Sequence, residues 1–451
     1  MESVGVSTGQ LGRATWVRLT ALRHEPLFAN AFFLWVNYAV VALSGFAFWT
    51  MAARIYSVEE VGLGSATLSA IMLLALVSHL GLGMGLVRFL PEARERGPSL
   101  VNLALSVSGL MALLASAVFI AGLPVWSPPL SYLRQQPEYA AAFALFVIAA
   151  TASVILDQAF VAARSAKYLL YRNPLALLVR ISLLGFFVSL GGAFSIAAAT
   201  GLGALVGVFV GLTLLRRAVP SYRARLVLER GPPTFFTFTM ANYIAELSLT
   251  APGLVIPIMV VNVLGSDQAA YYYTGWLFGQ MLHGVSFALA LSMVAEGSRD
   301  RASLPVLSRN ALAFAFPLVG AGALVMLLVG DKLLLAFGGS YSSESAGVLR
   351  LMAVAALPGV LVHLYLGIQQ VRKDIGALVS LVVLVAFVAL GTSYLLLPRL
   401  GIEGAGLGIL AGYGSGALLA LARLWREPRV TGMKTLALAL FRGGNPKGEG
   451  L

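Results

Sequence analysis

Long apolar runs recur along the whole 451-residue chain, and they constrain its fold more than any other feature. A helix needs about 20 mostly apolar residues to span a bilayer, and twelve runs reach that length. Only 11% of the residues are charged, whereas a soluble domain carries about 25%. The sequence therefore predicts an all-α polytopic membrane protein with about twelve transmembrane helices. The runs cover roughly residues 27–52, 61–90, 101–123, 140–163, 174–190, 194–215, 234–263, 269–295, 311–329, 346–371, 375–397 and 404–422.

Basic residues are distributed unevenly among the segments between these runs. If the N-terminus is cytoplasmic, the cytoplasmic segments hold 25 of the 31 Lys and Arg residues and the external loops hold four. Cytoplasmic segments of membrane proteins carry an excess of Lys and Arg, so both termini are expected to be cytoplasmic and the chain to lie in the cell membrane. No signal peptide is evident. Trp16, Leu19 and Leu22 lie at helical spacing among arginines, which predicts either a helix in the headgroup layer or a poorly ordered tail.

Two patterns repeat with a shift of 205 residues, which indicates an internal duplication. Asn37-Tyr38 returns as Asn242-Tyr243, and a glycine ladder at 203, 207 and 211 returns at 408, 412 and 416. Small residues at this spacing let helices pack closely in lipid. An even number of helices before the repeat predicts two parallel six-helix lobes, related by an axis along the membrane normal. The expected organisation is a cytoplasmic segment 1–26, an N-lobe 27–215, a basic loop 216–233, a C-lobe 234–422 and a basic cytoplasmic tail 423–451.

Several kinds of chemistry are missing from the sequence. The chain has no cysteine and no Gly-Lys dipeptide, so it has neither a thiolate metal site nor a P-loop. Its four histidines are far apart in sequence. The predicted protein is not an enzyme, holds no metal or cofactor and binds no nucleic acid. Any transport must then be coupled to the membrane potential, a proton or sodium.

Charged residues inside membrane helices are costly and therefore mark candidate functional sites. Asp157 and Arg180 belong to the fourth and fifth runs, which form a hairpin. These two side chains are expected either to form a structural ion pair or to leave Arg180 in the central cavity as an anion site. A third interpretation is that Arg180 extends toward the headgroups.

The seventh run carries a polar face composed of Asn242, Glu246 and Thr250, just before Pro252-Gly253 and Pro257. The prolines predict a bend in a helix that lines the cavity. Glu246 is a candidate proton or sodium site, or a contact to sugar hydroxyls; alternatively Asn242 and a protonated Glu246 hydrogen-bond between helices. Asn37, which corresponds to Asn242 in the repeat, is a further cavity candidate.

The eighth run places Tyr272, Trp276, Gln280 and His283 at spacings of four, four and three. Such a stripe either binds sugar rings or forms an interfacial aromatic belt that continues into helix packing. Arg350, at the edge of the tenth run, is expected to anchor lipid headgroups or to contact an anion at the cavity mouth.

Residues 44–64, SGFAFWTMAARIYSVEEVGLG, and residues 81–91, GLGMGLVRFLP, resemble Wzx-type polysaccharide-biosynthesis flippases. These belong to the MOP superfamily, together with MATE antiporters and MurJ-like lipid II flippases. The similarity is clearest over 27–180 and includes Asp157, Arg164, Arg172 and Arg180; twelve helices suit the Wzx type better than the MurJ type.

The resemblance implies two six-helix lobes around a central cavity, alternating access, and a polyprenyl-diphosphate-linked oligosaccharide that moves to the external leaflet. It also implies contacts with membrane lipids and with other polysaccharide-assembly proteins. Two alternatives stay open: a MATE-like cation-coupled exporter of small organic molecules, and a membrane enzyme that acts on lipid-linked sugars.

Overall fold

The computed structural model describes residues 26–188, 192–228, 233–298 and 300–426. Within these ranges the chain forms helices and no strand, which confirms the predicted all-α fold. The N-terminal stretch with Trp16, the C-terminal tail beyond 426 and part of the basic loop lie outside the described residues.

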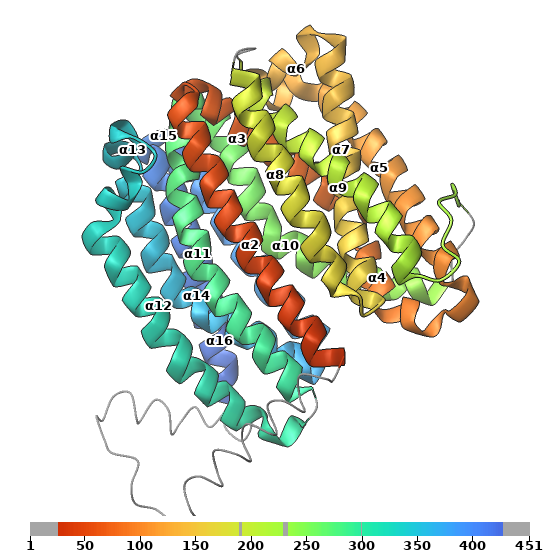
Figure 1. Cartoon of the computed structure of the whole chain (residues 1–451). Helices are drawn as coiled ribbons and strands as arrows, with labels where there is room; N and C mark the ends of the chain where they lie inside the picture. Colours follow the sequence, from red (N-terminus) through yellow and green to blue (C-terminus); the bar gives the residue numbers. More distant parts are fainter. Residues whose placement is uncertain (1–25, 189–191, 229–232, 299, 427–451) are drawn as a thin grey trace, which may run out of the picture.

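The first half of the chain forms helices α2 to α9 (Figure 1). Two of them are short: α4, which follows α3, and α6, which lies between α5 and α7. The first-half helices are α2 (Pro26–Ile55), α3 (Val58–Ser78), α4 (Leu82–Phe89), α5 (Gly97–Trp126), α6 (Tyr132–Gln135), α7 (Pro137–Ala162), α8 (Leu169–Phe187) and α9 (Phe194–Ala218).

The second half forms α10 to α16 and contains one short helix, α13. These helices are α10 (Pro233–Leu264), α11 (Ser266–Gly297), α12 (Leu304–Leu334), α13 (Gly339–Glu344), α14 (Ala346–Arg372), α15 (Ile375–Leu400) and α16 (Ile402–Arg426). In the described ranges, eleven helices are long and apolar enough to cross a membrane, and a shorter apolar helix, Val40–Ile55, lies within α2. Eleven of the twelve predicted apolar runs thus correspond to one helix each.

The second predicted run, 61–90, is not one continuous helix. It divides into α3 and α4 because Leu80 and Gly81 adopt φ angles of 49° and 67°, in the left-handed region that cannot continue an α-helix. A side chain at Gly81 would also collide with Tyr243, because an added Cβ would lie 2.7 Å from the Tyr243 Cβ. The break thus brings α4 close against α10.

Both glycine ladders lie at tight helix contacts, as the small-residue spacing predicted. A Cβ added at Gly203 would lie 2.7 Å from the Ala176 carbonyl oxygen of α8. In the second half, a Cβ at Gly412 would lie 2.7 Å from the Cβ of Ala389 in α15. The two ladders therefore make equivalent contacts, α9 against α8 and α16 against α15.

The two halves meet mainly through α3, which packs against α10 and α11, while α2 lies between α8 and α11 (Figure 1). At the end that carries α6 and α13, Asn262 Nδ2 donates to the Trp126 carbonyl at 2.9 Å. At the other end, which carries α4, the Tyr243 hydroxyl donates to the Val77 carbonyl at 3.0 Å. Hydrogen bonds thus join the halves at two separate levels of the bundle.

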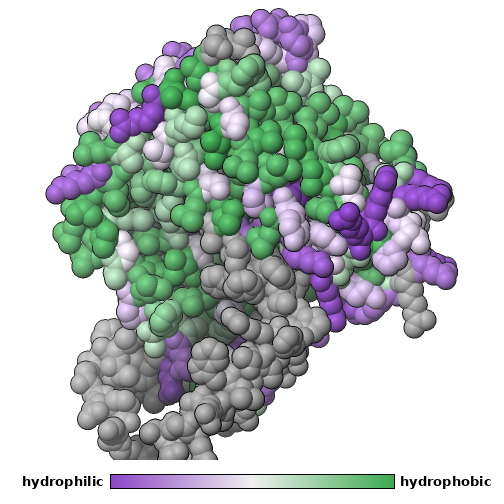
Figure 2. All heavy atoms as spheres, in the orientation of Figure 1, coloured by the Kyte–Doolittle hydropathy of each residue, from purple (hydrophilic) through white to green (hydrophobic). Residues whose placement is uncertain are grey.

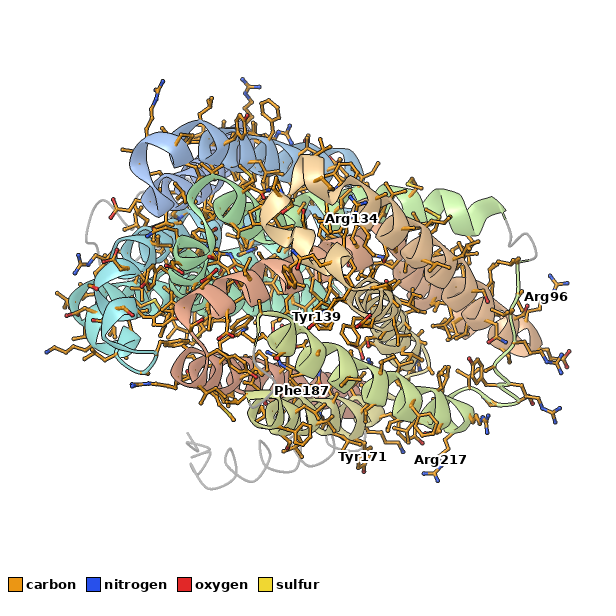
Figure 3. The ribbon with its side chains drawn as sticks, turned by 90° about the horizontal axis from the view of Figure 1, so that it is seen from above. Arg96, Arg134, Tyr139, Tyr171, Phe187 and Arg217 are labelled. Carbon is orange, nitrogen blue, oxygen red and sulfur yellow. The ribbon has the colours of Figure 1, made fainter. Side chains whose placement is uncertain are left out.

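The outer surface suits a lipid environment. Figure 2 shows a broad apolar area over the visible face, with hydrophilic residues gathered toward its edges. Arg96 and Arg217 are exposed and lie at the periphery of the bundle (Figure 3). This distribution is typical of a protein that crosses a bilayer and carries its charges at the membrane–water interface.

Candidate functional site

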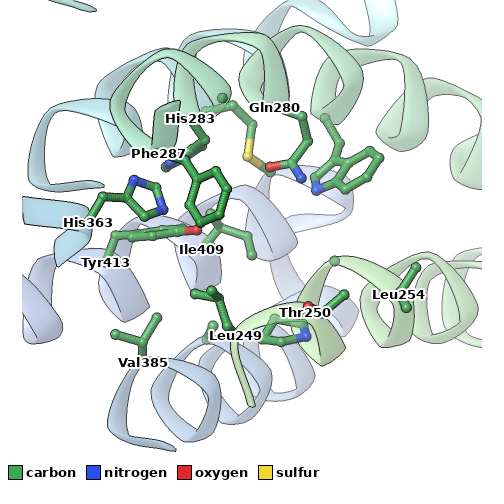
Figure 4. Close-up of a pocket in the computed structure, with 16 residues that line it drawn as sticks. Leu249, Thr250, Leu254, Gln280, His283, Phe287, His363, Val385, Ile409 and Tyr413 are labelled. Carbon is green, nitrogen blue, oxygen red and sulfur yellow. The ribbon is translucent and has the colours of Figure 1, made fainter. Parts of the chain in front are cut away.

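A cavity of about 310 Å³ opens among the helices of the second half (Figure 4). We call it the second-half cavity. Five helices supply its walls: α10, α11, α14, α15 and α16. The lining residues are Leu249, Thr250, Pro252, Gly253, Leu254, Trp276, Gln280, His283, Gly284, Phe287, Met352, His363, Val385, Ala389, Ile409 and Tyr413.

Two polar side chains of this cavity lie near the middle of their helices and are accessible. Gln280 is near the middle of α11 and is exposed, and Thr250 of α10 is exposed as well. Helix α10 continues through Pro252 as one helix. Gly253 lets it approach α11, since a Cβ there would lie 3.1 Å from Trp276 Cζ2. Thr250 from the predicted polar face of α10 therefore meets Trp276, Gln280 and His283 from the predicted stripe on α11 at one cavity.

Two buried histidines and Tyr413 form one wall. The rings of His283 and Tyr413 are stacked with centroids 4.3 Å apart. The Ser286 hydroxyl donates to the His283 carbonyl, so it accepts a hydrogen bond from His363 Nδ1 at 2.8 Å. His363 then carries its proton on Nδ1 when neutral. Among the described residues, neither ring nitrogen of His283 has a hydrogen-bond partner.

Arg180 of α8 lies where the two halves meet. Its guanidinium carbon is 3.5 Å from the centroid of the Phe48 ring in α2, a cation–π contact. Tyr273 of α11 lies near it from the other half of the chain. Arg180 Nε is buried and has no hydrogen-bond partner in the described part of the chain. No ion pair joins this arginine to a carboxylate among those residues.

An aromatic row connects Arg180 to the second-half cavity. It consists of Phe48, Trp49, Tyr273 and Trp276. The centroid distances along the row are 5.4 Å between Phe48 and Trp49, 4.5 Å between Trp49 and Tyr273, and 5.2 Å between Tyr273 and Trp276. Because Trp276 also lines the cavity, the row crosses from the first half of the chain to the second.

The predicted pairing of Asp157 with Arg180 is wrong, because Asp157 pairs with Arg172. Arg172 is only 3% exposed and also donates from Nε to the Gly207 carbonyl at 3.1 Å. Helix α8 begins at Leu169, five residues before the predicted start, so Arg172 lies level with Asp157 in the hairpin. Arg180 lies about 16 Å along the helix from Leu169, at 1.5 Å per residue.

The two asparagine candidates and Glu246 lie apart from the second-half cavity. Asn173 Nδ2 donates to Asn37 Oδ1 at 3.0 Å, which joins α8 to α2. Glu246 Oε1 is 3.8 Å from His79 Nε2 across the two halves, and His79 Nδ1 accepts the Gly81 amide proton. Asn242, one turn from Glu246 on α10, is half-buried. Glu246 therefore lies beside the break between α3 and α4.

Two further candidates do not line the cavity. Tyr272 is 0% exposed and packs in the core, so it does not belong with Trp276 and Gln280. Arg350 is exposed on α14. The residues missed from the sequence are Arg172, His79, His363 and Tyr413, together with the Phe48–Trp49 pair. For Arg172 a signal existed, since it follows Asp157 by 15 positions across a short hairpin.

Comparison with known proteins places this fold. The chain matches the family model described as "Polysaccharide biosynthesis protein" over residues 27–311. No curated protein matches it. The fold is similar to an inward-facing multidrug resistance MATE family transporter of the MOP superfamily, at 16% identity and a TM-score of 0.63, covering 87% of this chain and 99% of that one.

Two more solved structures share the fold. One is the lipid II flippase MurJ in an inward closed conformation, at 10% identity and a TM-score of 0.70, covering 88% of this chain and 87% of that one. The other is a MOP superfamily transporter from Pyrococcus furiosus, at 16% identity and a TM-score of 0.61, covering 91% and 97%. The chain thus belongs to the polysaccharide biosynthesis protein family and is a multi-pass membrane protein with the fold of these transporters.

Proposed function

We propose that this protein is a flippase that moves a polyprenyl-diphosphate-linked oligosaccharide from the cytoplasmic to the external leaflet by alternating access. The observation that carries the proposal is Arg180, a guanidinium inside a membrane helix without an acidic partner among the described residues. A charge at this depth costs roughly 2.5–3.5 kcal/mol on insertion scales. A diphosphate between the halves would offset that cost, because Arg binds phosphate oxygens through two parallel hydrogen bonds.

The aromatic row gives a surface for the sugars. Phe48 and Trp49 are 0% and 5% exposed in the conformation described, so sugars contact this row only after the halves separate. Aromatic faces offer apolar contact to the C–H side of a sugar ring, and Trp and Tyr add a polar edge. The polyprenyl tail stays in lipid while the headgroup crosses between the halves.

The orientation and partners follow the charge distribution. Both termini are cytoplasmic, since this places 25 of the 31 basic residues inside. Membrane lipids surround the protein, and other polysaccharide-assembly proteins are its expected neighbours, because they would supply the glycan and use it after transfer.

The membrane potential suffices to drive transfer. A diphosphate carries roughly two negative charges, and moving one charge across 100 mV is worth about 2.3 kcal/mol. Outward movement from a cell that is negative inside therefore gains roughly 4–5 kcal/mol per 100 mV. A proton or sodium ion at Glu246 would serve to reset the empty carrier. The Glu246 side chain is 35% accessible. An accessible carboxylate could bind a cation, and this observation favours the alternative of a MATE-like cation exporter.

The test uses proteoliposomes and a fluorescent lipid-linked oligosaccharide. Arg180→Ala should abolish transfer, and Arg180→Lys should restore part of it because the charge returns without the bidentate geometry. Arg217→Ala, which changes an exposed arginine at the periphery of the bundle, is the matched control and should transfer at the wild-type rate. Transfer by Arg180→Ala at the wild-type rate would refute the proposal. So would wild-type protein that moves an organic cation but no lipid-linked glycan.

A further inference from the structure

The second-half cavity has the composition of a binding site for an uncharged polar ring. We infer that it is a separate subsite for a neutral sugar of the transported glycan, with Gln280, Trp276 and Thr250 as its recognition groups. This inference rests on the proposed function, because it assigns the sugar and the diphosphate of one substrate to different halves of the chain.

The cavity is the right size and polarity for such a ligand. Its volume of about 310 Å³ lies at the lower end of small-molecule pockets, which span ≈300–1,000 Å³. It holds one small polar ring rather than an extended chain. None of its lining residues is acidic, and none is Lys or Arg. A diphosphate would lose its hydration in this cavity without gaining a cationic partner. A neutral sugar carries no charge and avoids that desolvation cost.

The lining groups have hydrogen-bonding capacity to spare. In the described ranges, no hydrogen bond is made by the side chains of Gln280, Thr250 or Tyr413. Gln280 and Thr250 are moreover exposed at membrane depth, where polar groups without water or a partner are costly. An amide and two hydroxyls provide both donors and acceptors. This mixture complements sugar hydroxyls, each of which also donates and accepts.

The cavity walls add the apolar contact that a sugar ring requires. Trp276 belongs both to the aromatic row and to the cavity, so a substrate held at Arg180 extends along the row and reaches the cavity at this side chain. The proline-containing stretch of α10 lies against the Trp276 ring through Gly253. A sugar that stacks on Trp276 and moves its ring would therefore also displace α10.

A cation or proton site suits this cavity less well. No carboxylate faces the histidines from any of the five helices that line it. The nitrogens of His283 are sealed from the cavity, and a Cβ at Gly359 would lie only 2.7 Å from His283 Nδ1. The proton-bearing nitrogen of His363 is occupied by Ser286. These rings support the wall more than they offer ligands.

The experiment compares two probes on the full-length protein in nanodiscs. One is a polyprenyl diphosphate, and the other is the same lipid carrying a single N-acetylated hexose. The variants are Gln280→Leu and Thr250→Val, which keep side-chain size and remove hydrogen bonds. Tyr272→Phe is the matched control, because it deletes one hydroxyl from a fully buried side chain of the same helix that does not line the cavity.

Wild-type protein should bind the glycosylated lipid more tightly than the bare lipid. Loss of one hydrogen bond should weaken binding of the glycosylated lipid by about 2- to 12-fold and leave binding of the bare lipid unchanged. Tyr272→Phe should change the affinity for neither lipid. If wild-type protein binds the two lipids equally, or if Gln280→Leu and Thr250→Val weaken both alike, the subsite assignment is overturned. Failure of wild-type protein to bind either lipid would instead overturn the proposed function.

Discussion

Replacing Arg172 with methionine tests the ion pair that holds α7, α8 and α9 together. The guanidinium has three acceptors: the Asp157 carboxylate, the Gly207 carbonyl at 3.1 Å and the Ser153 carbonyl at 3.3 Å. Methionine has a similar length and no charge, so Arg172→Met preserves volume and deletes all three interactions. Both glycines that face this side chain on α9, Gly207 and Gly211, keep the space it occupies.

The expected loss of stability is set by the burial of the two partners. Removing one member of a buried pair costs about 3–5 kcal/mol, because the other charge is left uncompensated. Arg172 is 3% exposed, so little else replaces it beside Asp157 and the loss should be at least about 3 kcal/mol. Removing both charges in Arg172→Met/Asp157→Leu should return stability to within about 1 kcal/mol of wild type, since apolar replacements of buried pairs are often neutral.

The assay is equilibrium unfolding in mixed micelles with increasing SDS, together with transfer of the lipid-linked glycan. If the single and double variants unfold at the same SDS fraction, the ion pair contributes nothing and the stability comes from the α8–α9 contact alone. If the stable double variant no longer transfers substrate, Asp157 belongs to the substrate path. Wild-type transfer by that variant would confine this pair to a structural role.

Three further substitutions test single contacts. Glu246→Gln should remove the dependence of transfer on external pH if Glu246, 3.8 Å from His79, carries the coupling proton; an unchanged pH profile excludes that role. Gly62→Ala would place a Cβ 1.7 Å from the Ser266 carbonyl oxygen and should separate α3 from α11. The chain has no cysteine and Ser127 is buried, so a cysteine introduced by Ser127→Cys should react with an aqueous maleimide only when the helices separate. Gly109→Ala, with open space at its Cβ, should leave that cysteine protected. Gly359→Ala should lower the unfolding temperature by displacing His283 at a cost of about 1–3 kcal/mol, while Gly414→Ala, which meets no atom within 4 Å, should have little effect.

The helices were predictable from sequence because span length and hydropathy are local properties. The sequence predicts even the short separation between α8, which ends at Phe187, and α9, which begins at Phe194. The break between α3 and α4 was not, because a glycine-rich apolar stretch fits a membrane helix equally well. The helix ends there because Leu80 and Gly81 adopt positive φ angles. At the same point Gly81 packs against Tyr243 of the other half.

The error at Asp157 has a comparable origin. Arg172 and Asn173 are polar and precede a proline, a pattern that predicts a loop followed by a helix that begins at Pro174. In the folded protein the charge of Arg172 is neutralised by Asp157 and its guanidinium lies against the glycines of α9. Because Asp157 neutralises it, Arg172 becomes acceptable within the helix. The hydropathy of the α8 segment alone does not reveal this pairing, which depends on the position of Asp157 across the hairpin.

The stripe on α11 illustrates how far periodicity leads. At about 100° per residue, His283 lies about 20° from Tyr272 around the helix, Trp276 about 40° and Gln280 about 80°. Exposure follows that order: Tyr272 is 0% exposed, His283 5%, Trp276 half-buried and Gln280 exposed. The stripe is therefore a core edge that turns gradually into a cavity wall, and only its far side is available to a ligand. His363 and Tyr413 join that wall from α14 and α16, so their place follows from helix packing rather than from any spacing in the sequence. This gradient is also why Gln280 and Tyr272 form a sharp pair of substitutions, since one helix presents them to the cavity and to the core respectively.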